Sequence, residues 1–298
     1  MAKRIRRLII FTLMVIAITI VFLFPIGFAY FYINALVNHG CDNRPEPLSS
    51  RLTHPAGLQK FTFSPQEGIT LDAWYAPGTN GAGVIVLPGA WGGADTMYQE
   101  MEFLHEAGYS VMTYDTRSCA DPPQQTSLGY TEISDLKAAL DIFSQYPGVG
   151  DIGVFGHSMG GATALMTAAE DNRIKAVVAT GNYADLADQV RRDDSQRAWW
   201  EQYTRDWIVR MYGWKTGVDM DKASPLKIIG NISPRAVYLM HGSKEIGDSR
   251  GDEQFEAAGE PKQFWLVEGA GHGDYPSVDF EHYKNSTIEF FNQYLLNS

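Results

Sequence analysis

Residues 8–33 form a run of 26 residues without a charged side chain (LIIFTLMVIAITIVFLFPIGFAYFYI). About 20 apolar residues in a helix are enough to cross the hydrocarbon core of a bilayer. A secretory signal peptide has a shorter apolar stretch and a small-residue cleavage site, whereas this run is rich in bulky residues near its end. A helix buried in a soluble protein would show a polar face, which the run lacks. We therefore expect residues 1–37 to form a basic stub and a transmembrane anchor, which Pro25 and Gly27 kink or end.

The charges on either side of this run predict its orientation. Four basic residues precede it, namely Lys3, Arg4, Arg6 and Arg7. The first charge after the run is Asp42, and the segment that follows is mixed in charge. The excess of basic residues on the cytoplasmic side of membrane proteins predicts a single-pass protein with a cytoplasmic N-terminus and an extracytoplasmic remainder.

Residues 38–57 (NHGCDNRPEPLSSRLTHPAG) are polar and proline-rich, which predicts a linker. The following residues 58–298, in a chain that is 45% hydrophobic, are long enough for one large globular domain. A net charge of −11 argues against nucleic-acid binding, which requires a basic face.

The chain has two cysteines, Cys41 and Cys119, and lacks the C-x-x-C pairs of zinc ribbons and thioredoxin-like proteins. A disulfide between them is formally possible, but we do not expect it because Cys41 lies in the linker. Cys119 is expected to pack as a small buried apolar residue.

After the linker, short apolar runs alternate with segments of helical length. The runs at 58–65 and 69–77 alternate in polarity and predict an antiparallel pair of strands. Further strands are expected at 82–89, 109–116, 151–158, 174–182, 235–243 and 263–267, and helices at 96–109, 131–145, 159–170 and 279–296. This alternation predicts an α/β fold with a mostly parallel central sheet and helices on both faces.

Residues 183–223 depart from this alternation and contain the aromatic helical segment RRDDSQRAWWEQYTRDWIVRMYGW. Since the segment lies between two strands, we expect a short helical lid insertion above the sheet. Its aromatic side chains either pack on the domain, cover an apolar acyl pocket or lie at a bilayer interface.

The segment GHSMGG places Ser158 where a predicted strand turns into a predicted helix. In this context G-x-S-x-G indicates a nucleophile at a tight turn, because the glycines allow strand and helix to approach closely. The helix N-terminus also favours negative charge developing near the serine. The alternative is a structural turn with an ordinary serine.

A nucleophilic serine needs a base, and the chain has seven histidines. His272 lies in a glycine-rich loop directly after the strand QFWLV, and we expect it to be that base. The others lie in the linker, in helices, beside the serine or after another strand, namely His39, His54, His105, His282, His157 and His241.

The base needs an orienting carboxylate, and the loop after the strand at 235–243 offers Glu245 and Asp248. Both lie between Ser158 and His272 in the chain, in the order serine, acid, histidine. The oxyanion of the reaction needs two backbone amides. We expect that of Met159 and, from the loop LPGAWGGAD, that of Ala90 or alternatively Trp91.

From about residue 60 onward the chain resembles the α/β-hydrolase superfamily. The resemblance rests on motifs in this order: LPGAWGG, YDTRSCA, GYTEISDLKAALD, GHSMGG, SPLKIIGNISPRAVYLMHGSKE and VEGAGHGDYP. The chain looks most like membrane-anchored serine hydrolases with one N-terminal span. In that family the acid commonly lies three residues after the glycine of an H-G pair, usually as aspartate, which implies Glu245 here. The family tends to have glycine after the arginine of the Y-D-x-R loop, where this chain has Ser118 and Cys119, a departure that bears on pocket shape.

The sequence thus predicts a membrane-anchored serine hydrolase that cleaves carboxylic esters, lipid-derived esters or thioesters through a covalent acyl intermediate. The expected partners are a small-molecule acyl substrate and the membrane, with no nucleic acid, no obligate protein partner, no metal and no cofactor. A serine peptidase acting on small peptides is the enzymatic alternative. A non-catalytic binding protein on the same scaffold would lack a member of the triad, and none is missing.

Overall fold

The computed structural model describes residues 2–41, 57–66, 68–192 and 198–297. Eight strands form one sheet in the order β1-β2-β4-β3-β5-β6-β7-β8. β2 is antiparallel to both β1 and β4, and all other neighbouring pairs are parallel. The strands are β1 (Gln59–Gln66), β2 (Ile69–Ala76), β3 (Gly83–Leu87), β4 (Ser110–Tyr114), β5 (Ile152–His157), β6 (Ile174–Thr180), β7 (Ala236–Gly242) and β8 (Lys262–Val267). The predicted mostly parallel α/β architecture is confirmed.

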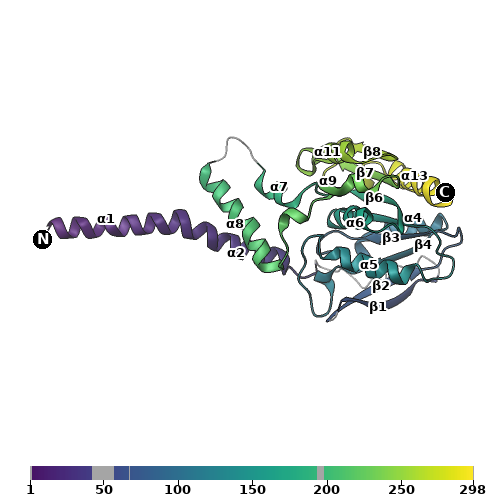
Figure 1. The fold of residues 1–298 in the computed structure, drawn as a ribbon, viewed down its shortest axis with the longest axis horizontal. Coiled ribbons are helices and arrows are strands. Elements are labelled where there is room, and N and C mark those ends of the chain that lie inside the picture. The colour runs from purple at the N-terminus through teal and green to yellow at the C-terminus, as the bar shows by residue number, and fades with distance from the viewer. Residues whose placement is uncertain (1, 42–56, 67, 193–197, 298) are drawn as a thin grey trace.

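Helices cover both faces of this sheet (Figure 1). In β3, Val84 and Val86 point to one face, where α4 (Tyr98–Glu106) and α13 (Phe280–Phe291) pack. Ile85 and Leu87 point to the other, which α5 (Glu132–Phe143) and α6 (Met159–Glu170) cover. This twofold alternation with every residue buried is why β3 reads as a continuous apolar run. Four short helices lie further along the chain: α9 (Pro225–Ile228), α10 (Ile246–Ser249), α11 (Gly251–Ala257) and α12 (Tyr275–Val278).

The N-terminal apolar segment is one helix from Lys3 to Val37 and is long and apolar enough to cross a membrane. It consists of α1 (Ala2–Ile18), a π-helical turn at Thr19–Leu23 and α2 (Phe24–Val37). The helix ends at neither Pro25 nor Gly27 but continues to Val37. The π turn directly precedes Pro25, the kind of local adjustment that lets a helix pass through a proline.

α2 is docked on the globular part of the protein, whereas α1 projects away from it (Figure 1). The buried side chains of α2 recur at every fourth residue, at Pro25, Ala29, Ile33 and Val37. Ala29, Ile33 and Val37 form one apolar cluster with Ile208, Met211, Tyr212 and other residues of the expected lid. In the described part of the expected lid, residues 183–192 and 198–223, the chain forms α7 (Leu186–Arg191), α8 (Trp199–Thr216) and a 3-10 turn at Met220–Lys222. Residues 193–197 of the expected lid lie outside the described residues.

Cys41 and Cys119 form a disulfide. The expectations of no disulfide and of a free buried Cys119 were therefore wrong. Cys41 lies four residues after the end of α2, and Cys119 lies in the turn after β4, so the docking of α2 brings together two residues that are 78 positions apart. The rest of the expected linker, residues 42–56, lies outside the described residues.

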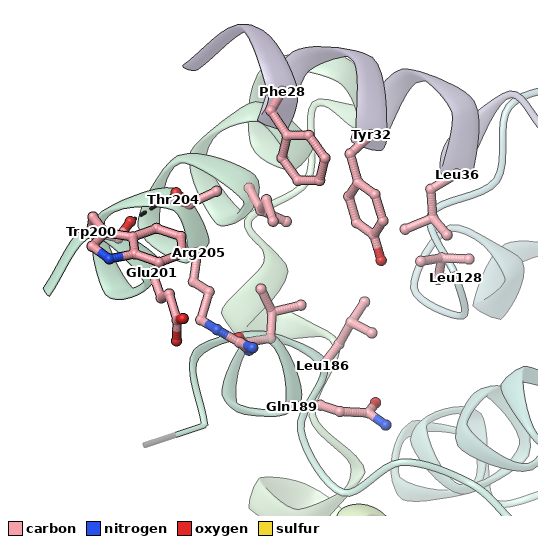
Figure 2. Close-up of a pocket in the computed structure, with 12 residues that line it drawn as sticks. Phe28, Tyr32, Leu36, Leu128, Leu186, Gln189, Trp200, Glu201, Thr204 and Arg205 are labelled. Atoms are coloured by element: carbon pink, nitrogen blue, oxygen red, sulfur yellow. Dashed lines mark hydrogen bonds between the residues drawn. The ribbon is translucent and has the colours of Figure 1, made fainter. Parts of the chain in front are cut away.

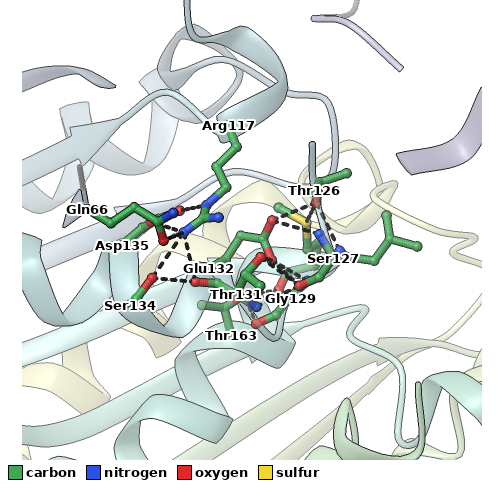
Figure 3. A network of polar contacts seen from close by, with 12 residues as sticks. Gln66, Arg117, Thr126, Ser127, Gly129, Thr131, Glu132, Ser134, Asp135 and Thr163 are labelled. Atoms are coloured by element: carbon green, nitrogen blue, oxygen red, sulfur yellow. Dashed lines mark hydrogen bonds and ion pairs between the residues drawn. The ribbon is translucent and has the colours of Figure 1, made fainter. Parts of the chain in front are cut away.

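Two buried carboxylates fix the loop between β4 and α5 (Figure 3). Asp135 holds Arg117 through two short contacts, 2.7 and 2.8 Å from the guanidinium nitrogens. Glu132 accepts hydrogen bonds from the Thr126 hydroxyl at 2.7 Å and from the Gly129 amide at 2.9 Å. Burying a carboxylate is costly unless it is paired in this way, so both side chains serve to hold the loop in one conformation.

Candidate active site

Ser158 lies at the turn between β5 and α6 with φ 54° and ψ −118°, a left-handed conformation that non-glycine residues rarely adopt. The neighbouring glycines make the turn possible. A Cβ atom at Gly156 would lie 2.3 Å from the carbonyl oxygen of Gly160, and one at Gly160 would lie 2.5 Å from that of Pro88. The spacing G-x-S-x-G is therefore a steric requirement of this strand-to-helix turn.

The loops after β7 and β8 bring two further side chains to Ser158. The Nε2 atom of His272 lies 3.0 Å from the Ser158 hydroxyl oxygen. Its Nδ1 atom lies 2.7 Å from a carboxylate oxygen of Glu245. All three residues follow the carboxyl ends of parallel strands, the edge at which open α/β sheets bind ligands.

Glu245 is held by more than the histidine. Its other carboxylate oxygen accepts hydrogen bonds from the Gly242 amide at 3.0 Å and from the Tyr275 hydroxyl. Burial by itself raises the pKa of Glu245, but the hydrogen bonds from His272, Gly242 and Tyr275 outweigh burial and bring this pKa to about 2. Glu245 is thus ionised at neutral pH.

An ionised Glu245 fixes the state of His272. A carboxylate only accepts hydrogen bonds, so the Nδ1 atom of the imidazole carries a proton and the Nε2 atom is left free to accept one from Ser158. The hydrogen bond to Glu245 raises the pKa of His272, while partial burial acts in the opposite direction. This arrangement suits a general base that becomes positively charged during the reaction.

Asp248, the alternative acid, is placed differently. It belongs to α10, its side chain is 84% exposed, and one carboxylate oxygen lies 3.1 Å from a guanidinium nitrogen of Arg192. The carboxylate that contacts the imidazole is that of Glu245. We therefore propose Glu245 as the acid.

Two other histidines, His157 and His241, lie near the site and contact residues other than Ser158. The Nδ1 atom of His157 lies 3.0 Å from the Thr180 hydroxyl, and burial lowers the pKa of His157 to about 4. Burial also lowers the pKa of His241 to about 4. Both imidazoles are neutral at pH 7 and are structural neighbours of the site.

The loop after β3 passes beside Ser158. A Cβ atom at Gly89 would lie 3.4 Å from the Cβ atom of the serine. Ala90 and Trp91 follow in this loop, and Trp91 has a left-handed φ of 59°. Met159 is the first residue of α6, so its amide lies at the helix N-terminus, where amides are not used by the helix itself. We propose the amides of Met159 and Ala90 as oxyanion donors, with Trp91 as the alternative to Ala90.

A cavity of about 320 Å³ opens at the serine. Its lining residues are Ser158, Gly181, Tyr183, Gln189, Glu245, Asp248, Ser249 and His272. Among the described residues no group of three or more histidine, cysteine or acidic side chains is arranged to hold a metal ion.

Sequence reasoning missed two residues that shape the site. Tyr275 donates its hydroxyl hydrogen bond to Glu245 from three positions beyond His272. Gly181 has φ +60°, and a Cβ atom there would lie 2.4 Å from the Tyr275 hydroxyl oxygen and 3.1 Å from the Nδ1 atom of His272. The glycine after a buried strand was a visible signal for a close approach, whereas no local pattern points to Tyr275.

The sequence model of the alpha/beta hydrolase family matches residues 84–282, which include Ser158, Glu245 and His272. The chain belongs to the alpha/beta hydrolase family. An uncharacterised protein of Pseudomonas aeruginosa is 25% identical to this chain over 293 residues, and the match covers 76% of this chain and 77% of the relative.

Solved structures agree with this hydrolase on the fold. An esterase of Pyrococcus furiosus has a TM-score of 0.66 at 20% identity, with 87% of this chain and 98% of that chain covered. An acylaminoacyl peptidase of Pyrococcus horikoshii has a TM-score of 0.60 at 16% identity, with 82% of this chain and 42% of that chain covered. At these identities the likeness concerns the fold alone.

The assignment of the acid makes a prediction. Replacement Glu245→Gln should lower kcat/KM for p-nitrophenyl acetate by about three to four orders of magnitude, because the amide no longer fixes the tautomer of His272. The residual activity should have its acidic limb at lower pH, because the carboxylate that raises the pKa of His272 is gone.

The matched control is Asp248→Asn, which should retain about the wild-type rate and pH profile because Asp248 is an exposed partner of Arg192. The assignment is wrong if Asp248→Asn abolishes turnover and Glu245→Gln does not.

Proposed function

We propose that this hydrolase is a membrane-anchored serine esterase that cleaves carboxylic esters through an acyl-enzyme. The observation that carries the proposal is the continuous chain of contacts from Glu245 through His272 to Ser158, at 2.7 and 3.0 Å. Nucleophile, base and orienting acid within hydrogen-bond reach of one another are the geometry of nucleophilic acyl transfer.

In this mechanism the Ser158 oxygen attacks the ester carbonyl carbon as His272 takes the hydroxyl proton. The resulting oxyanion is held by the amides of Met159 and Ala90. His272 then gives its proton to the leaving alcohol as the carbon–oxygen bond of the ester breaks. A water molecule, deprotonated by His272, attacks the acyl-enzyme and releases the carboxylic acid and free Ser158.

One observation favours an ester over a peptide recognised by its amino terminus. An enzyme that recognises the amino terminus of a peptide needs a carboxylate to pair with it. In this cavity Glu245 is committed to His272 and Asp248 lies beside Arg192.

We further propose that the helix from Lys3 to Val37 is retained as an anchor, with the catalytic domain outside the cytoplasm. The basic residues before the run support this orientation. The disulfide between Cys41 and Cys119 supports an oxidising compartment, since disulfides are rare in the cytosol. The packing of α2 on α8 supports a helix that stays part of the folded protein.

The reaction is tested with a fluorophosphonate probe and a panel of acyl esters, thioesters and aminoacyl amides. We expect one labelled site and ester turnover, both lost in Ser158→Ala, with kcat/KM reduced at least about a thousandfold. Ser249→Ala, which removes another serine hydroxyl of the same cavity, should remain labelled. Labelling that survives Ser158→Ala overturns the nucleophile, and turnover of the amides alone favours a peptidase.

The topology is tested in intact cells with a membrane-impermeant reductant followed by a membrane-impermeant maleimide. Cys41 and Cys119 should be labelled after this reduction, because the disulfide faces the outside. A cysteine introduced in the basic stub by Ala2→Cys should be labelled only after lysis. The orientation is contradicted if the two native cysteines also require lysis.

A further inference from the structure

Two further cavities extend from the active-site cavity toward the membrane helix. The first, of about 540 Å³, shares Gln189 with the active-site cavity. The second, of about 460 Å³, shares Phe28, Trp200 and Thr204 with the first. Each cavity therefore borders the next, in a series that leads from Ser158 past Gln189 to the surface of the N-terminal helix.

The first cavity lies between helices α2 and α8 and the rest of the catalytic domain, as Figure 2 shows. Phe28, Tyr32 and Leu36 line it from α2, and Trp200 and Thr204 line it from α8 (Figure 2). Leu186 and Gln189 of α7 and Leu128 line the opposite side, and the charged side chains of Glu201 and Arg205 lie at the α8 side (Figure 2). Most of the lining side chains are apolar, whereas the cavity at Ser158 is lined mainly by polar side chains. A ligand that fills both cavities would have an apolar tail and a polar reacting group.

The second cavity is more apolar still. Seven of its eight lining residues are apolar or aromatic, and the eighth is Thr204. Its wall is formed by the N-terminal helix from Ile20 to Phe28 and by Trp199 and Trp200 at the start of α8.

The depth of this cavity in a bilayer follows from helix geometry. About 20 helical residues of 1.5 Å rise cross a hydrocarbon core of ~30 Å, so a span that begins after Arg7 ends near Gly27. Ile20 to Phe24 then lie in the outer leaflet. Trp199 and Trp200, which are 63% and 51% exposed, lie beside them at the level where tryptophans gather in membrane proteins.

We propose that the acyl chain of a bilayer lipid enters sideways between α2 and α8 and follows these cavities until its ester carbonyl reaches Ser158. The inference rests on the proposed esterase function and names its substrate class, a long-chain acyl ester drawn from the outer leaflet. The polar leaving group departs to solvent past His272, whose side chain is 52% exposed. The products are a fatty acid and the alcohol of the lipid.

The route is tested with the full-length protein in phosphatidylcholine nanodiscs, by comparing kcat/KM for p-nitrophenyl palmitate and p-nitrophenyl acetate. Wild type should prefer palmitate. Thr204→Trp places a bulky ring where the first and second cavities meet. It should lower the palmitate-to-acetate ratio about tenfold, the loss expected when roughly two buried methylene contacts are removed.

The matched control is Gln202→Trp, the same new side chain at an exposed position of α8 that lines none of the three cavities. It should keep the wild-type ratio. An acetate preference in the wild type, or equal ratios in the two variants, overturns the route while leaving the esterase intact. Loss of both activities in the wild type, or activity that survives Ser158→Ala, overturns the esterase itself.

A measurement without mutation covers the case in which Thr204→Trp does not fold. A phospholipid with a photoreactive diazirine on its acyl chain is placed in the nanodiscs, and the crosslinked residues are mapped. Crosslinks at Leu186 or Leu128, on the domain side of the cavity, are expected. Crosslinks confined to the N-terminal helix overturn the route.

Discussion

The left-handed backbone of Ser158 is the constraint on which the proposed catalytic centre depends. Its amide donates a 2.7 Å hydrogen bond to the Thr180 carbonyl oxygen at the end of β6, so the turn is tied to the neighbouring strand. Gly156 and Gly160 provide the space for the turn, and the family match places it in the fold that presents a serine in this manner. Once the serine stands at this edge of the sheet, the loops after β7 and β8 are the elements that reach it.

The second constraint is the attachment of the N-terminal helix. The Trp91 indole donates a 3.1 Å hydrogen bond to the Leu36 carbonyl oxygen, and the Thr126 amide donates a 3.0 Å bond to that of Val37. Together with the disulfide at Cys41, these contacts join the end of α2 to the loops beside Ser158. The helix is thus a wall of the hydrolase as well as the proposed anchor, and the proposed anchoring would hold the site at a fixed distance from the membrane surface.

Most of the fold followed from the sequence, because parallel strands buried on both faces appear as short apolar runs. The sequence also predicted that Ser158, Glu245 and His272 would lie close together. Each of them follows a parallel strand, and the carboxyl ends of these strands lie at the same edge of the sheet. Residue spacing alone did not decide whether Glu245 or Asp248 orients the histidine, because both lie in one loop. The imidazole contact of Glu245 separates them in the structure.

The features that the sequence did not reveal depend on packing between distant segments. The role of Tyr275 depends on how two loops approach each other. The disulfide depends on the docking of α2, and in a run where nearly every residue is apolar the docked face carries no distinguishing pattern. The boundaries of anchor, linker and catalytic domain stay predictions.

The acyl-enzyme at Ser158 is tested most directly by rapid quenching during turnover of p-nitrophenyl palmitate, followed by peptide mass spectrometry. We expect a burst of p-nitrophenol matched by a palmitoyl adduct on the peptide that contains Ser158. Turnover without a covalent acyl group, or an adduct on another residue, would contradict the proposed mechanism.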